Sequence, residues 1–166
     1  MTTQLLVFGV LGVLTTAYAI WVNRRLFGAD GASGVGVLEA VYYVVGVVSV
    51  GIGWYFNVKF THHEGAGANY WSYTRALFAN WAADSAAQDY IIVNVVLLPL
   101  WTIVDGRRRG LRAPWIFFVI SLFTSLAFAM AFYLAVVERQ ERLARRTSAA
   151  GAARAEGPGD RAPATT

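Results

Sequence analysis

The chain has 166 residues, of which 57% are hydrophobic and 14% are charged. This balance is more apolar than that of a soluble domain, and the length fits a single domain. The sequence has no cysteine, which excludes disulfides, thiolate catalysis and thiolate metal sites. The formal net charge of +4 comes from arginines at the ends of apolar runs and in the tail, so it indicates contact with acidic lipid headgroups and not with nucleic acid.

Four apolar segments are each expected to cross a membrane as a helix, because a helix satisfies its own backbone hydrogen bonds in lipid. The expected spans are residues 5–22, 37–58, 86–104 and 113–137. The last has no charged residue and is the clearest, whereas the third is purely apolar, apart from Asn94, over only about 15 residues, which is short for a hydrocarbon layer of roughly 30 Å. The sequence therefore predicts an all-α membrane protein, a bundle of about four transmembrane helices.

Residues 1–146 form this predicted bundle, and residues 147–166, dominated by Ala, Gly, Pro, Ser and Thr, form a predicted disordered tail. Pro99 predicts a kink in the third helix, because it removes one backbone donor. Small residues at helical spacing predict packing faces on three of the spans. They are Gly9, Gly12, Thr16 and Ala19 on the first, Gly46, Ser49 and Gly53 on the second, and Ser121, Ser125 and Ala129 on the fourth.

Four crossings leave equal numbers of basic residues on the two sides of the membrane, so the positive-inside rule gives no direct answer. One side holds Arg24, Arg25, Arg107, Arg108, Arg109 and Arg112, and the other holds Lys59, Arg75, Arg139, Arg142, Arg145 and Arg146. We expect the loops 23–35 and 105–112 to be cytoplasmic, because the short amino terminus is uncharged and two arginines directly follow the first helix. The basic tail would then lie on the opposite side.

The stretch between the second and third spans mixes polar and aromatic residues and predicts an interfacial or re-entrant segment. Asn80, Asp84 and Gln88 repeat every four residues, so on a helix they form one polar stripe. This stripe either faces water or caps a polar pocket at the mouth of the bundle that aromatic residues close. The candidate ligand or pocket residues are Asn80, Asp84, Asp89, Asn94, Arg75 and Trp81.

Asp89 lies at the edge of an apolar run, where a carboxylate needs protein, water or a cation as its neighbour. Arg75 is the nearest opposite charge, and Lys59 is another. The acid is either a structural feature of the helix end or part of a functional site. Asn94 lies deeper on the same helix, and such amides commonly join helices through a hydrogen bond worth about 1 kcal/mol.

Histidines and arginines provide the remaining candidate sites. His62, His63 and Glu64 could suggest a metal, but adjacent histidines on a loop lack the spacing of helical zinc motifs, so a solvated loop is favoured. The lipid-headgroup candidates are Arg107, Arg108, Arg109 and Arg112, with docking of an acidic partner as the alternative. No catalytic set indicates an enzyme, and no motif names a cofactor.

Several short motifs carry a family resemblance. They are Leu77-Phe78-Ala79-Asn80, Asp89 nine positions after Asn80, Asp105-Gly106-Arg107-Arg108 with Gly110, and Val137-Glu138-Arg139. From about Tyr42 to Leu143 the chain resembles a family of small bacterial membrane proteins known only as a domain of unknown function, number 2834. Members usually have Glu where Asp105 stands and a Pro near Met130, which this chain lacks. The resemblance implies a protein of the bacterial plasma membrane and no known reaction.

A fainter similarity runs to the Aba4-like membrane proteins associated with carotenoids, which also place an Asp before a span ending in a basic loop. The sequence thus predicts a non-catalytic membrane protein, which is either an accessory subunit or a binder of a small lipophilic ligand. Its expected partners are the lipid bilayer and either other membrane proteins or further copies of this chain in a homo-oligomer. The alternative is a protein that modifies or binds isoprenoids or carotenoids, with Asn80 to Asp89 as its polar pocket mouth. Ion movement through Asp89 and Asn94 has less support, since these two groups do not make a relay.

Overall fold

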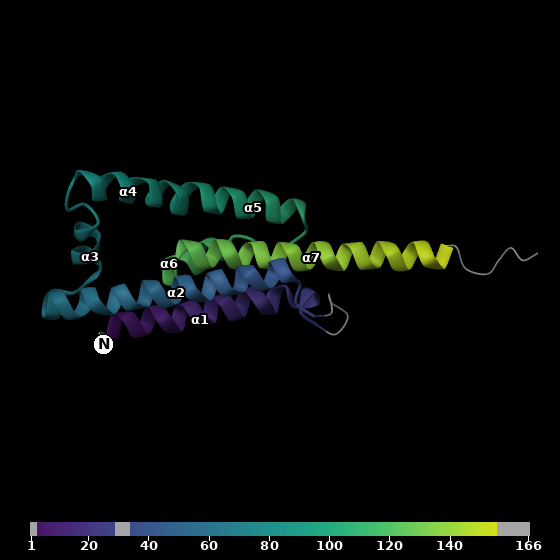
Figure 1. Ribbon diagram of the computed structural model, residues 1–166, viewed down its shortest axis with the longest axis horizontal. Helices are drawn as coiled ribbons and strands as arrows, with labels where there is room; N and C mark the ends of the chain where they lie inside the picture. Colours follow the sequence, from purple (N-terminus) through teal and green to yellow (C-terminus); the bar gives the residue numbers. More distant parts are fainter. Residues whose placement is uncertain (1–2, 29–33, 156–166) are drawn as a thin grey trace, which may run out of the picture.

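The computed structural model describes residues 3–28 and 34–155, and over these residues the chain is helical, with no strand. The elements are α1 (Thr3–Val22), η1 (Arg24–Leu26), α2 (Val37–Glu64), η2 (Gly65–Gly67), α3 (Tyr70–Ala76), α4 (Trp81–Ile92), the π-helical turn η3 (Val93–Leu97), α5 (Leu98–Arg108), α6 (Ile116–Phe123) and α7 (Leu126–Ala155). Figure 1 shows an elongated bundle with α3 at one end and the far part of α7 projecting from the other. The all-α prediction is confirmed.

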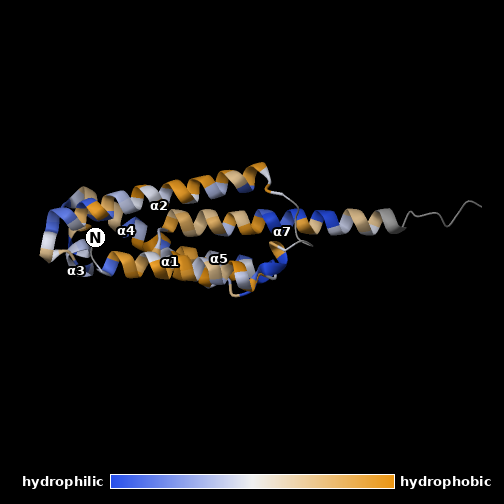
Figure 2. Ribbon diagram, turned by 90° about the horizontal axis from the view of Figure 1, so that it is seen from below, coloured by the Kyte–Doolittle hydropathy of each residue, from blue (hydrophilic) through white to orange (hydrophobic). Residues whose placement is uncertain are grey.

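Three helices are long and apolar enough to cross a membrane, over Thr3–Val22, Val37–Gly67 and Trp81–Arg108. Figure 2 shows hydrophobic residues along their lengths and hydrophilic residues gathered toward the ends of the bundle. Many large apolar side chains on these helices are exposed, as expected where lipid is the solvent. The second and third helices are longer than the predicted spans 37–58 and 86–104, and the third takes in Asp84 and Asp89.

The third long helix changes its hydrogen-bond register just before Pro99. Pro99 has no N–H group, and its ring crowds the carbonyl of Val95 four residues earlier. The chain responds with the π turn η3, in which the N–H of Leu98 bonds to the carbonyl of Val93. One widened turn therefore lies between α4 and α5, at the position where the sequence predicts a kink.

The fourth predicted span, 113–137, is not one helix, and the expectation of a continuous helix there is wrong. α6 ends where Thr124 leaves the helical conformation, with φ of −121° and ψ of −95°. The chain then reverses, so α6 and α7 lie antiparallel: the ring of Phe117 is 5.7 Å from that of Phe132 and 5.0 Å from that of Tyr133. Apolar composition did not reveal this turn, because the reversal uses small hydroxyl residues that interrupt hydropathy very little.

Two hydroxyl side chains support the turn of this hairpin. Thr124 Oγ1 donates to the carbonyl of Ile120 at 2.7 Å, and Ser125 Oγ accepts the N–H of Phe128 at 3.0 Å, which caps α7. Ser125 also meets Ser49 of α2, with their hydroxyl oxygens 3.2 Å apart. The carbonyl of Ile120 and the N–H of Phe128 therefore have side-chain partners, which irregular backbone in apolar surroundings requires.

Glycines allow α1 and α2 to pack closely against neighbouring elements. A Cβ on Gly12 would lie 2.7 Å from Thr124 Cγ2, at the tip of the hairpin. A Cβ on Gly46 would lie 3.2 Å from the Phe128 ring, and one on Gly9 would lie 2.7 Å from the ring of Trp54. The predicted packing faces are confirmed at these three glycines, whereas Gly53 would meet nothing within 4 Å.

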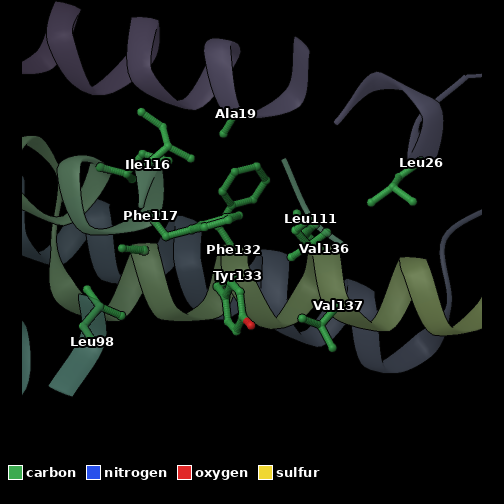
Figure 3. Close-up of a cluster of buried hydrophobic side chains, with 12 residues drawn as sticks. Ala19, Leu26, Leu98, Leu111, Ile116, Phe117, Phe132, Tyr133, Val136 and Val137 are labelled. Carbon is green, nitrogen blue, oxygen red and sulfur yellow. The ribbon is translucent and has the colours of Figure 1, made fainter. Parts of the chain in front are cut away.

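The hydrophobic core is centred on the α6–α7 hairpin. Phe117 and Tyr133 have no exposed surface. Figure 3 shows them with Phe132, near Ala19 of α1 and Leu98 of α5. By contrast, α4 contacts mainly the π turn that follows it. Packing is therefore concentrated around the hairpin and is sparse beside α4.

The connecting segment and the tail also have helical parts. The predicted interfacial segment holds η2 and α3, and the ring of Tyr73 on α3 lies 5.3 Å from that of Phe60 on α2. At the other end, α7 continues to Ala155, so the structure differs from the expected disorder over 147–155. The rest of the expected tail, 156–166, lies outside the described residues.

Candidate functional site

Asn80 is the amino-terminal cap of α4. Its Oδ1 accepts the backbone N–H groups of Ala82 and Ala83, both at 3.1 Å, which satisfies two donors that the helix itself leaves unpaired. Asp84 follows in the first turn, where a carboxylate interacts favourably with the helix dipole. It is half-buried, and its Oδ1 has no partner among the described residues. Trp81 is 91% exposed and covers neither of them.

Asp89 is exposed on α4, and its Oδ1 accepts a hydrogen bond from Gln88 at 2.8 Å. Within residues 3–28 and 34–155 it forms no ion pair with Arg75 or Lys59, the partners that the sequence suggested. Arg75 lies exposed on α3. The structure therefore does not bring the predicted pocket-mouth residues together into one bonded cluster.

Asn94 differs from the other predicted residues because it is buried, with only 4% of its surface exposed. It lies in the π turn, and its Nδ2 donates to the hydroxyl of Tyr90 at 3.3 Å. Its Oδ1 has no partner in the described part of the chain, and neither has the hydroxyl of fully buried Thr102 on α5. Buried polar atoms without partners are rare in folded proteins, so this strip of the third helix is one candidate ligand position.

A fully buried charged side chain lies elsewhere, at Glu39 in the first turn of α2. Its side chain is fully buried and bonds to two arginines of α7: Arg139 Nε donates to Oε1 at 2.7 Å, and Arg142 Nη2 donates to Oε2. Tyr43 donates to Oε1 at 3.0 Å, and the N–H of Gly36 donates to Oε2 at 3.3 Å. This cluster ties α7 to the start of α2.

A second polar network ties α5 to the hairpin. Asp105 accepts hydrogen bonds from Tyr133 at 2.5 Å and from Arg109 at 2.7 Å. Arg109 also bonds to Glu141 at 2.6 Å. The hydrogen bonds to Glu141 and then to Asp105 raise the pKa of Arg109 above its usual range, so the guanidinium keeps its charge in this network.

The loop that follows α1 is bonded to the loop that follows α5. Asn23 is buried, with its Nδ2 donating to the carbonyl of Arg112 at 3.1 Å and its Oδ1 accepting the N–H of Arg112 at 2.9 Å. Arg25 donates to the carbonyl of Gly110 at 2.6 Å. We call the end of the molecule that holds these contacts and the two acidic networks the basic end, and the end at α3 the opposite end.

Sequence reasoning missed Glu39, Tyr43 and Tyr133 as members of polar networks. The signal for Glu39 was available: it is an acid at the edge of an apolar run, the same argument that selected Asp89. Its partners Arg139 and Arg142 could not be assigned, because a continuous fourth span puts them on the far side of the membrane from Glu39.

Toward the opposite end, α1 and α2 carry two neighbouring surface grooves that share Trp54. One has a volume of about 590 Å³ and is lined by Gly51, Trp54, Tyr55, Val58, Lys59 and His62. The other, of about 390 Å³, is lined by Trp54 and by residues of α1 from Leu6 to Leu14. Of the predicted metal candidates, His62 lines the larger groove. In the described part of the chain, no set of three His, Asp or Glu residues is placed so that it could hold a metal.

The fold is that of an all-helical protein with three helices able to cross a membrane and a polar, arginine-rich end. Residues 41–139 match the model of a family described as a protein of unknown function, DUF2834, and this match covers more than half of the chain. The chain belongs to this family, which confirms the resemblance seen in the sequence. No curated protein and no solved structure matches it. The fainter similarity to the Aba4-like proteins is not shown by these comparisons.

Asp105 and Arg139, which both belong to motifs of the family resemblance, lie in the two polar networks of the basic end. Asn80, which belongs to another, caps α4. These motif residues therefore have identifiable structural roles. They do not by themselves indicate a reaction.

Proposed function

We propose that the chain is a non-catalytic protein of the bacterial plasma membrane that binds a small lipophilic molecule in the grooves along α1 and α2. The observation that supports this most is the pair of grooves that meet at Trp54. Ligand sites are typically apolar concavities with a few polar groups, and volumes of several hundred Å³ suit a drug-sized or lipid-sized molecule.

The polar groups of the larger groove suggest which ligand it takes. Lys59 and His62 lie at the end nearer the end of α2, and Lys59 Nζ is 5.3 Å from the centre of the Tyr55 ring. Gly51 and Trp54 line the end toward the middle of the helix. The ligand would therefore have an apolar body beside Trp54 and a head that is anionic or accepts hydrogen bonds beside Lys59.

Filling the groove tests this proposal. A Cβ on Gly51 would meet nothing within 4 Å, so Gly51→Leu can place a large side chain in the groove without disturbing the packing. Gly53→Leu is the matched control, because Gly53 has the same free space and the same helix but does not line the groove. Each variant is purified in mild detergent, and the lipids that co-purify are identified by mass spectrometry.

We expect the wild type and Gly53→Leu to retain one lipid class above its share of the membrane extract, and Gly51→Leu to lose it. Equal retention by Gly51→Leu would overturn the proposal. Retention of another protein in place of a lipid would favour the accessory-subunit alternative.

A second candidate function is binding of an isoprenoid or carotenoid, and the unpartnered Oδ1 of buried Asn94 favours it. This oxygen could accept a hydrogen bond from the hydroxyl of such a ligand inside the membrane. Deletion of the gene, followed by complementation with the wild type or with Asn94→Leu, tests it. An extractable lipid and pigment profile that the deletion leaves unchanged would remove this candidate.

A further inference from the structure

The α6–α7 hairpin extends only part of the way through a membrane. α6 has eight residues and is therefore about 12 Å long, which is less than half of a hydrocarbon layer of roughly 30 Å. Its tip, at Thr124, packs against Gly12, near the middle of α1 (Thr3–Val22). If α1 crosses the membrane, the hairpin turns back near the bilayer centre.

α7 then returns to the end from which α6 started. Its successive contacts on α2 run backward along that helix, from Ser125 with Ser49 to Arg139 with Glu39 at the beginning of α2. In Figure 1, α7 continues in this direction beyond the ends of its neighbours. The segment 113–137, which the sequence predicts as a fourth crossing, thus begins and ends at the basic end of the bundle.

This reversal gathers the positive charges at the basic end. Within residues 3–28 and 34–152, that end holds ten arginines and four carboxylates, whereas the opposite end holds one lysine, one arginine and three carboxylates. The ten are Arg24, Arg25, Arg107, Arg108, Arg109, Arg112, Arg139, Arg142, Arg145 and Arg146. The balance of basic residues that four crossings would produce is absent from this arrangement.

Arginines of the basic end differ in what they contact. Arg109, Arg139 and Arg142 point into the acidic networks described above. Arg107 and Arg112 are exposed and form no ion pair with any described residue. Exposed arginines without an ion pair, such as these two, attract acidic headgroups where helices leave the bilayer.

We propose that α6 and α7 form a re-entrant hairpin in a chain with three crossings, and that the resulting arginine-rich surface docks on acidic phospholipids of the cytoplasmic leaflet. Basic residues near the ends of spans are retained on the cytoplasmic side, so the strong asymmetry between the two ends orients the chain. The loops 23–35 and 105–112 are then cytoplasmic, as the sequence suggested, but the projecting end of α7 lies on the same side of the membrane as these loops and not on the opposite side. This inference is independent of the groove along α1 and α2.

The absence of cysteine from the sequence allows a direct test of the topology. Ala66→Cys, at the opposite end, and Ala150→Cys, on the projecting part of α7, each introduce one thiol at an exposed position. Intact cells are treated with a maleimide that cannot cross the membrane, and permeabilised cells are the control. We expect labelling of Ala66→Cys in intact cells, and of Ala150→Cys only after permeabilisation.

The other labelling patterns contradict the proposal in distinct ways. Four crossings put both positions on one side, so both thiols would then behave alike. Labelling of Ala150→Cys but not of Ala66→Cys in intact cells would mean that the basic end faces outward.

The lipid partner is tested in reconstituted vesicles of phosphatidylcholine and phosphatidylglycerol, with spin-labelled lipids reporting which headgroup contacts the protein. We expect wild-type protein to select phosphatidylglycerol, and Arg107→Gln with Arg112→Gln to weaken that selection, by up to about fivefold for each charge removed. Arg75→Gln, at the opposite end, is the matched control and should leave selection unchanged. Equal selection by the double variant and the wild type would overturn the docking claim.

Discussion

At the scale of single residues, the carboxylate of Glu39 is fully buried and therefore depends on its bonded partners. A charge removed from water is costly unless other charges and hydrogen bonds replace the water. Glu39 has such replacements from Arg139, Arg142, Tyr43 and the N–H of Gly36. The arginines, in turn, depend on Glu39, since Arg139 and Arg142 are only 11% and 18% exposed.

Replacing this carboxylate should therefore weaken the fold strongly. We expect Glu39→Gln to lower the free energy of unfolding by about 3 kcal/mol, because breaking a buried pair leaves an uncompensated charge. Denaturant titration in detergent micelles measures the change. Glu64→Gln is the control, since Glu64 is exposed at the other end of the same helix. Equal stability of the two variants would contradict the role given to Glu39.

At Tyr133, a substitution can remove a single hydrogen bond and leave the packing of the side chain in place. Its hydroxyl donates to Asp105 at 2.5 Å, and its ring is fully buried against Phe117. Tyr133→Phe keeps the ring and removes only the hydrogen bond to a charged acceptor, which should cost about 2 kcal/mol of unfolding free energy. Tyr18→Phe, at a side chain that is 41% exposed, should change little. A thermal melt that shows no difference between these variants would argue against this bond.

At the scale of elements, the sequence predicted most of the helices but not the chain reversal between α6 and α7. α1 and the start of α2 agree with the expected spans, because hydropathy and flanking charges mark where a helix meets lipid. Hydropathy is insensitive to chain reversal, however, and Thr124 with Ser125 supply internal partners for the turn without adding charge. The polar cluster at Glu39 was missed for the same reason, since it forms only once α7 turns back.

The contact between the hairpin tip and α1 gives a prediction for this element. A Cβ on Gly12 would be 2.7 Å from Thr124 Cγ2 and 3.3 Å from the carbonyl oxygen of Phe123, so Gly12→Ala must displace the tip. We expect a loss of about 2 kcal/mol in unfolding free energy, typical of overpacking. Gly53→Ala meets nothing within 4 Å and should be neutral or slightly stabilising, because alanine favours helix. Comparison of the two melting curves checks this, and a neutral Gly12→Ala would contradict the packing of the tip.

At the scale of the whole molecule, the stabilising contacts and the candidate ligand grooves separate along its length. Tight packing and paired charges lie around the hairpin and at the basic end, whereas the grooves lie toward the opposite end. The sequence singled out the polar residues Asn80 to Asp89, but it could not show that they are mostly a helix cap and exposed side chains. Those contacts depend on three-dimensional placement, which residue spacing alone does not determine.

The same division predicts which part of α7 the fold needs. Up to Glu141 and Arg142 the helix bonds to other elements, but from Thr147 to Ala152 its side chains are exposed. A chain that ends after Arg146 should therefore keep the unfolding free energy of the full chain to within about 0.5 kcal/mol, as expected for changes away from packed or bonded groups. A chain that ends after Glu138 is the contrasting variant, because it loses Arg139 and Arg142 and leaves Glu39 buried without its partners, so it should fail to fold in detergent. If both truncations are equally stable, the arginines of α7 do not hold the hairpin in place, and the single-sided arrangement of the charges loses its structural basis.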